Sequence, residues 1–173
     1  MEVCSFTDCE VLFQPISQLL IPGSRKMFRP LFPNSPARHV YGLRIARSDL
    51  GYRSLGLPTD IATKGQHCRA EVYLREHGWV PVDPADVRKV VLEEPPGNRP
   101  LGDAIVARAR DSLFGSWEMN WIAYNYAHDV DLPGSANKPL VYFMYPQAET
   151  SEGRIDPFDP ANFKYEITAR EII

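Results

Sequence analysis

Residues 67–83 read HCRAEVYLREHGWVPVD. Apolar and polar side chains alternate in the first eight of these residues, and after a short polar segment that ends at Gly78 the last five have a valine at every second position. Alternation with a period of two is typical of β-strands that bury one face, and a short connection containing glycine is typical of a β-hairpin. The stretch therefore predicts a hairpin from His67 to Asp83.

The apolar residues also predict the register of this hairpin. One face of the first strand is apolar, and the valines of the second strand must join it if the hairpin is to bury one side. In that register Tyr73 lies opposite Trp79, and Asp83 lies diagonally across from His67 on the polar face. Such diagonal neighbours are about 7–8 Å apart at the backbone, a distance that two side chains can bridge. We therefore expect the imidazole and the carboxylate to lie within hydrogen-bonding distance.

An imidazole–carboxylate pair has two interpretations. A carboxylate bound to one ring nitrogen fixes the tautomer, stabilises the imidazolium and leaves the other nitrogen free to act on a nucleophile. The alternative is a surface pair without a catalytic role. Arg69 and Glu71 share the polar face with His67, so an ion pair between them beside the cleft is one alternative.

The composition fits one globular domain. The chain has 173 residues, of which 44% are hydrophobic and 24% charged, enough for a single core and too few for two full-sized domains. A net charge of -3 argues against a nucleic-acid partner, which would require a basic excess. No apolar run approaches the roughly 20 residues that span a bilayer, and the first residues do not resemble a signal peptide. We therefore expect no membrane partner and a cytoplasmic location by default.

The numbers of prolines and cysteines exclude some classes of fold. The 16 prolines exclude a bundle of long helices and favour short strands, turns and loops. They are dense before residue 36, which predicts an atypical proline-rich N-terminal segment, residues 1–35, partly disordered, and an ordered domain over residues 36–173. Three cysteines are too few for a disulfide scaffold.

The ordered domain is predicted to be α+β, with an antiparallel sheet and few packed helices. A helix is expected from Asp103 to Phe114, where apolar residues recur every four positions, an aspartate stands at the start and a glycine follows the end. Segments rich in aromatic and β-branched residues predict further strands. These segments are Arg38 to Ile45, Trp121 to Val130, Leu140 to Tyr145 and Phe163 to Thr168.

The hairpin and its flanks resemble the transglutaminase-like superfamily. In that family a histidine opens a Glu-Val-Tyr strand and an aspartate ends a Gly-Trp-Val-x-x-Asp-Pro strand, as in residues 67–84 here. Upstream, residues 35–42 (SPARHVYG) are similar to the Pro-Ala-Arg-x-Val-x-Gly strand of the family. Residues 113–149 are similar to the C-terminal part of bacterial members. The resemblance covers residues 36–173.

This resemblance implies a papain-like fold and a cysteine mechanism. In the family a cysteine at a helix N-terminus attacks an amide, and the thioester passes to an amine or to water, which is acyl transfer or amide and peptide hydrolysis. The matching positions make His67 the general acid–base and Asp83 the residue that orients it. A helix N-terminus and a nearby imidazolium both favour the thiolate. The implied partner is a protein or peptide substrate, and no cofactor is expected.

The position of the nucleophile stays open. The cysteine motif of the family would fall near Leu19 and Leu20, where this sequence has no cysteine. Cys9 could occupy the first turn of a short helix and is the first candidate, while Cys4 is a lesser one. Strand alternation turns Cys68 to the apolar face, where it is expected to be a small buried hydrophobe. A truncated gene, a misplaced start or a frameshift would also explain the missing motif.

Several alternatives accompany the enzyme interpretation. A non-catalytic remnant or peptide-binding module would keep the sheet without a competent nucleophile. A small-molecule enzyme using His128 and Asp129 is disfavoured, because neighbouring residues of a strand point to opposite sides. A zinc site at Cys4 and Cys9 lacks a second ligand pair at suitable spacing. Most aromatic residues between 117 and 145 are expected to pack on the sheet rather than bind a substrate. The oligomeric state is not predicted.

Overall fold

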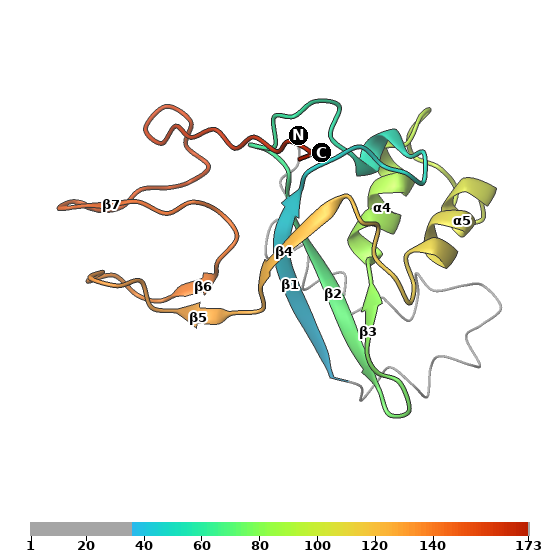
Figure 1. Ribbon diagram of the computed structural model, residues 1–173, viewed down its shortest axis with the longest axis horizontal. Coiled ribbons are helices and arrows are strands. Elements are labelled where there is room, and N and C mark those ends of the chain that lie inside the picture. Colours follow the sequence, from blue (N-terminus) through green and yellow to red (C-terminus); the bar gives the residue numbers. More distant parts are fainter. Residues whose placement is uncertain (1–35, 173) are drawn as a thin grey trace.

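The computed structural model describes residues 36–172, which form an α+β structure with an antiparallel sheet and two α-helices in that range (Figure 1). The core elements are β1 (Ala37–Arg44), η1 (Arg53–Leu55), β2 (Gln66–Leu74), β3 (Gly78–Val82), α4 (Pro84–Glu93), α5 (Ala104–Ser112) and β4 (Trp121–Asn125). Shorter strands follow: β5 (His128–Val130), β6 (Leu140–Tyr142), β7 (Glu149–Thr150) and β8 (Gly153–Arg154). The segment 1–35 and Cys4 and Cys9 within it lie outside the described residues.

The main sheet has the strand order β3-β2-β1-β4, and each neighbouring pair is antiparallel. The expected strand from Arg38 to Ile45 is confirmed as β1. Gly42 permits the close approach of β4, because a Cβ atom there would lie 2.2 Å from the carbonyl oxygen of Ile122 and 2.4 Å from the ring of Trp121. The indole of Trp121 instead donates a hydrogen bond to the carbonyl oxygen of His67, at 2.9 Å.

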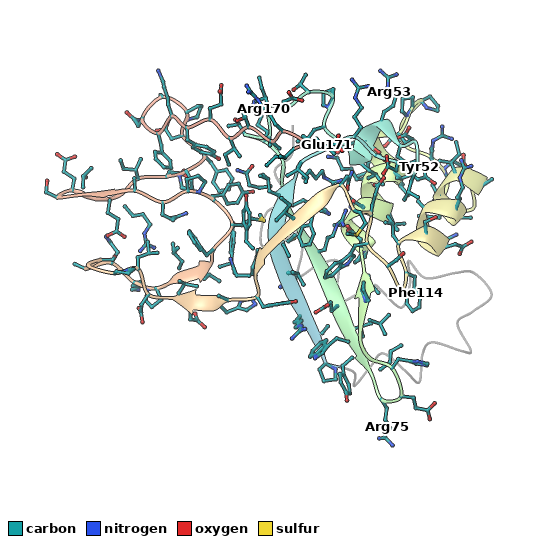
Figure 2. The ribbon with its side chains drawn as sticks, in the orientation of Figure 1. Tyr52, Arg53, Arg75, Phe114, Arg170 and Glu171 are labelled. Carbon is teal, nitrogen blue, oxygen red and sulfur yellow. The ribbon has the colours of Figure 1, made fainter. Side chains whose placement is uncertain are left out.

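The β2–β3 hairpin has the predicted register. Tyr73 pairs with Trp79, and Val82 pairs with Ala70, so Asp83 follows diagonally from His67. Gly78 has a φ of 73°, a left-handed conformation that glycine adopts without a steric cost. Arg75 lies at the tip of the hairpin and points away from the sheet (Figure 2).

Helix α4 begins where β3 ends, and α5 lies beside it (Figure 1). The predicted helix from Asp103 is confirmed as α5, with the Asp103 side chain accepting a hydrogen bond from the backbone N–H of Ile105 at 2.7 Å. The two helices bury a common apolar cluster with η1 and the residue before it. Its buried members are Tyr52, Leu55, Val87, Val90, Val106, Ala109 and Leu113. Tyr52 also donates a hydrogen bond to the carbonyl oxygen of Ile105, at 3.1 Å.

The segment after β4 extends away from the helices (Figure 1). Between residues 122 and 172 only Leu140, Met144 and Tyr145 are buried. Met144 and Tyr145 pack against Tyr41 and Cys68 on the apolar face of the sheet. None of the described helices is long and apolar enough to cross a membrane.

The structure corrects three secondary-structure predictions. The expected strand from Phe163 to Thr168 is wrong, since only Thr168 forms an isolated bridge, with Ile61. The expected strand from Trp121 to Val130 is divided into β4 and β5, because the Asn125 side chain accepts a hydrogen bond from the N–H of Ala127 and forms a turn. The strand expected from Leu140 to Tyr145 is shorter, ending at Tyr142.

The expected packing of the aromatic residues is correct only in part. Trp121 and Tyr145 are buried, whereas Tyr124, Tyr126 and Phe143 are exposed. These three side chains lie between residues 122 and 172, where few of the described residues are buried.

Candidate functional site

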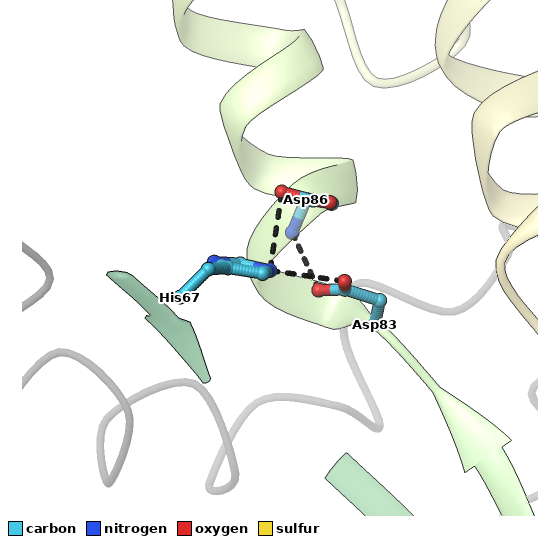
Figure 3. Close-up of side chains that lie close together, drawn as sticks. All are labelled: His67, Asp83 and Asp86. Atoms are coloured by element: carbon cyan, nitrogen blue, oxygen red, sulfur yellow. Dashed lines mark hydrogen bonds and ion pairs between the residues drawn. The ribbon is translucent and has the colours of Figure 1, made fainter. Parts of the chain in front are cut away.

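A histidine and two aspartates meet where β3 passes into α4 (Figure 3). His67 lies on β2, Asp83 directly follows β3, and Asp86 lies in the first turn of α4. The Nε2 atom of His67 is 3.0 Å from Oδ2 of Asp83 and 3.3 Å from Oδ1 of Asp86. The predicted contact between His67 and Asp83 is confirmed, and all three side chains are buried.

Asp83 is positioned by the start of helix α4. It is the N-cap of α4, and its Oδ1 accepts a hydrogen bond from the backbone N–H of Asp86 at 2.9 Å. Pro84 occupies the first helical turn, where no backbone N–H is needed. The other oxygen, Oδ2, faces His67. The same carboxylate therefore starts the helix and orients the imidazole.

Two buried arginines complete the cluster. Arg44 of β1 forms an ion pair with Oδ1 of Asp86, and the Nε of Arg69 of β2 lies 3.0 Å from Oδ2 of Asp83. Arg69 is held in turn by the carbonyl oxygen of Glu118, to which it donates a hydrogen bond at 2.6 Å. Two guanidinium groups thus balance two carboxylates, which lowers the cost of burying all four charges.

The two aspartates differ in acidity. Burial by itself raises the pKa of Asp83, but the charge and hydrogen bond of His67 and the charges of Arg69 and Arg44 lower it to about 2. Burial and the adjacent charge of Asp83 raise the pKa of Asp86, and His67 and Arg44 offset this only in part. Asp83 is therefore ionised near neutral pH and able to stabilise an imidazolium.

The second ring nitrogen of His67 is oriented away from both aspartates (Figure 3). Nε2 faces carboxylate oxygens, which only accept hydrogen bonds, so a neutral ring carries its proton on Nε2 and a lone pair on Nδ1. Among the hydrogen bonds of residues 36–172, none involves Nδ1. The arrangement leaves Nδ1 able to take up and return a proton.

The other candidate residues from the sequence do not join this cluster. Cys68 is buried against Tyr41, Met144 and Tyr145, on the opposite face of the sheet from the His67 side chain, as expected. His128 lies against Tyr41 instead, with 5.7 Å between the ring centroids. Asp129 is exposed.

The alternative of an ion pair between Arg69 and Glu71 is not observed. Glu71 binds Arg38 of the neighbouring strand, with 2.6 Å between the Nε and Oε2 atoms, while Arg69 turns toward Asp83. We did not predict Arg44 or Asp86 as members of the cluster. A signal for Asp86 was present, because an aspartate, a proline at the next position and a second aspartate three residues later are typical of a helix start.

Three side chains of the cluster have the chemistry of metal ligands. His67, Asp83 and Asp86 each offer one ligand atom, and these atoms lie within 4.8 Å of one another. However, Arg44 and Arg69 already neutralise both carboxylates. A divalent cation would leave an uncompensated positive charge in a buried site, which is costly. The cluster therefore does not fit a resident metal ion.

Comparison with known proteins supports one family resemblance. Residues 34–84 match the family model of the transglutaminase-like superfamily. The matched segment contains β1, β2 and β3 and both His67 and Asp83, but it ends before Asp86. It is narrower than the resemblance over residues 36–173 inferred from the sequence.

A curated relative extends over more of the chain. The sequence is 40% identical over 146 residues to an uncharacterized protein of Haemophilus influenzae, a match that covers 79% of this chain and 39% of that protein. The matched part is therefore about two fifths of the length of the relative. No solved structure matches the chain.

Proposed function

We propose that the protein performs cysteine-dependent acyl transfer or amide hydrolysis on a protein or peptide, in a papain-like arrangement of a thiol, His67 and Asp83. The contact between Nε2 of His67 and Oδ2 of Asp83, at 3.0 Å, carries this proposal. The match of residues 34–84 to the transglutaminase-like superfamily supports it independently, because the matched segment contains both residues.

The proposed reaction assigns a step to each group. Nδ1 of His67 takes the thiol proton, and the thiolate attacks the amide carbonyl carbon. The imidazolium then returns that proton to the nitrogen of the leaving amine as the carbon–nitrogen bond breaks, and a thioester forms. Water or a second amine then attacks the thioester carbon and gives a proton to His67. The carbon–sulfur bond breaks, the acid or the new amide leaves, and His67 returns the proton to the sulfur. Asp83 stabilises the imidazolium in both halves of the reaction.

Cys9 is the proposed nucleophile. Of the three cysteines, Cys68 is buried on the apolar face of the sheet, which leaves Cys4 and Cys9 in the segment before residue 36. Cys9 lies closer along the chain to β1, the neighbour of the strand that carries His67.

We propose that residues 1–35 form a separate N-terminal segment and that residues 36–173 form a transglutaminase-like domain.

One observation favours a second function, that of a non-catalytic peptide-binding module. The cluster of His67, Asp83, Asp86, Arg44 and Arg69 links β1, β2 and α4 through buried ion pairs. Such a network can be retained for the fold alone. In that case the cluster persists without an activated thiol.

Thiol alkylation separates the two functions without knowledge of the substrate. We expect iodoacetamide at pH 6 to modify Cys9 at least about tenfold faster than Cys4, because an ordinary thiol has a pKa near 8.5 and is almost fully protonated there. The variant His67→Gln should remove this difference. His77→Gln, at an exposed histidine of the hairpin turn, is the matched control and should keep it.

The outcome is measured by mass spectrometry of the peptides that contain Cys4 and Cys9. Circular dichroism of His67→Gln checks that the variant is folded. Equal alkylation of Cys9 in the wild-type protein and in folded His67→Gln would exclude an activated thiol–imidazole pair and favour the binding module.

A further inference from the structure

The first turn of α4 brings a second carboxylate to the nitrogen of His67 that Asp83 already binds. Oδ1 of Asp86 lies 3.3 Å from Nε2, compared with 3.0 Å for Oδ2 of Asp83. Only the contact with Asp83 has the geometry of a hydrogen bond. Nε2 carries one proton, so Asp86 acts on the ring mainly through its charge.

Asp86 is held at a cost to the fold. Its side chain is fully buried, and among the described residues its Oδ2 atom finds no hydrogen-bond partner. The nearest cation to that oxygen is Arg69, with 3.9 Å between Oδ2 and Nη2. An unsatisfied oxygen on a buried carboxylate is unfavourable, and such groups call for an explanation beyond packing.

The charges around the ring explain what Asp86 adds. Arg44 faces the cluster from β1, Arg69 from β2, Asp83 from the end of β3 and Asp86 from α4. The charge of Glu118, in the segment before β4, interacts with the two arginines more weakly than the charges of Asp83 and Asp86 do. With a neutral imidazole, two carboxylates balance two guanidinium groups. Without the charge of Asp86, a protonated ring would lie beside two arginines and one aspartate.

We propose that Asp86 is a positioning residue for His67, a second carboxylate whose charge keeps the imidazolium favourable beside two buried arginines. In its catalytic meaning this inference rests on the proposed function, because an imidazolium is the partner that a thiolate requires. The effect on the ring itself does not depend on any cysteine. The two claims can therefore fail separately.

The test compares the wild-type protein with Asp86→Asn, which removes the charge and keeps the size of the side chain. Nitrogen NMR of the histidine rings measures the ratio of doubly to singly protonated His67 at a fixed pH where both forms are populated. We expect this ratio to fall at least about tenfold, because the charge removed lies 3.3 Å from Nε2 in a buried site. Glu93→Gln removes a charge from the exposed end of the same helix and should change the ratio little.

A second variant guards against misfolding. Asp86→Asn leaves Arg44 buried without its partner, so the double variant Arg44→Gln/Asp86→Asn removes both charges. The same oxygen of Asp86 contacts Arg44 and the ring, so the ring is closer to the negative charge than to its partner. The double variant removes both charges, and the ratio should therefore fall, but by less than in Asp86→Asn. If Asp86→Asn and the double variant both leave the ratio unchanged, Asp86 has no effect on the ring and the inference is overturned.

Iodoacetamide alkylation of Cys9 at pH 6 then supplies the second readout. If Asp86→Asn lowers the ratio of doubly to singly protonated His67 and also slows the alkylation of Cys9, both the role of Asp86 and the proposed function are supported. If Asp86→Asn lowers this ratio but Cys9 is alkylated equally fast in the wild-type protein and in His67→Gln, the effect of Asp86 on the ring is supported and the proposed function is contradicted.

Discussion

Asp83 combines three contacts in one carboxylate. It caps α4 through Oδ1, and its Oδ2 faces both His67 and Arg69. Its pKa is about 2, below the ordinary value of 3.8, which means that the folded protein prefers the ionised form. The stability of the fold and the orientation of His67 therefore depend on the same charge.

We predict that this charge makes the protein sensitive to acid. The folded pKa of Asp83 lies below its ordinary value, so its contribution to the free energy of unfolding is complete above pH 3.8 and is lost as the pH falls toward 2. The loss should amount to about 2 kcal/mol. Asp86, whose pKa is raised, changes stability in the opposite sense, as its favourable contribution is lost when the pH rises through that raised value.

Urea unfolding of the wild-type protein and of Asp83→Asn, from pH 5 to pH 2.5, measures the contribution of Asp83 by difference. Asp111→Asn, at an exposed carboxylate of α5, is the control and should follow the wild type. An identical pH dependence for the wild type and Asp83→Asn would show that the carboxylate of Asp83 is not stabilised by its partners.

The two arginine–carboxylate pairs of the sheet should differ in energy. Arg69 is buried against Asp83, and we expect Arg69→Met to lower the free energy of unfolding by about 3–5 kcal/mol, since it leaves a buried charge without its partner. Arg38 is part-exposed beside Glu71, and Arg38→Met should cost about 1 kcal/mol. Chemical denaturation of both variants measures the difference. Equal costs would contradict the assignment of Arg69 to the buried cluster.

Alternation along one hairpin was enough to predict the contact between His67 and Asp83. It could not predict Arg44 or Asp86, because their pairing joins β1 to α4 across more than 40 positions and requires the three-dimensional fold. The partners of Arg69 and Glu71 stayed open for a similar reason. Both residues lie on β2, and only the neighbouring strand β1 supplies the arginine that binds Glu71 instead.

At the scale of the elements, local signals predicted β1, the hairpin and α5. Two predictions at this scale failed, since one helix was missed and one expected strand does not form. Helix α4 was missed although Asp83 and Pro84 mark its start. A strand was expected over residues 163–168, where aromatic and β-branched residues recur, but within the described part of the chain only Thr168 forms a bridge, to Ile61.

The junction of β1 and β4 provides a test of the sheet. A Cβ atom at Gly42 would lie 2.2 Å from the backbone of Ile122, so we expect Gly42→Ala to lower the free energy of unfolding by about 1–3 kcal/mol or more. Gly102→Ala is the matched control, since a Cβ atom there meets nothing within 4 Å. Thermal unfolding of both variants gives the answer. A neutral Gly42→Ala would contradict the close pairing of the two strands.

At the scale of the whole molecule, the described chain has a packed half and an open half. Residues 36–125 contain the four-stranded sheet, the two helices and the cluster around His67. Residues 126–172 bury only three side chains. Residues with few buried contacts open more readily than a packed core.

This contrast predicts the order of proteolytic cleavage after residue 35. We expect limited proteolysis to cut first within the exposed segments 131–139 and 150–154, while residues 37–93 stay intact. Mass spectrometry of the fragments over time gives the order of the cuts. Early cleavage within β1, β2 or β3 would contradict the packing of the sheet.

The central claim is that a thiol and His67 act together on an acyl group. The most direct measurement is the first turnover of p-nitrophenyl acetate, an activated ester that needs little specific recognition. We expect a rapid burst of nitrophenol, about one per chain, with an acetyl group on Cys9, and loss of the burst in Cys9→Ser and in His67→Gln. A burst of the same size in folded His67→Gln, or no acetylated cysteine in the wild-type protein, would contradict it.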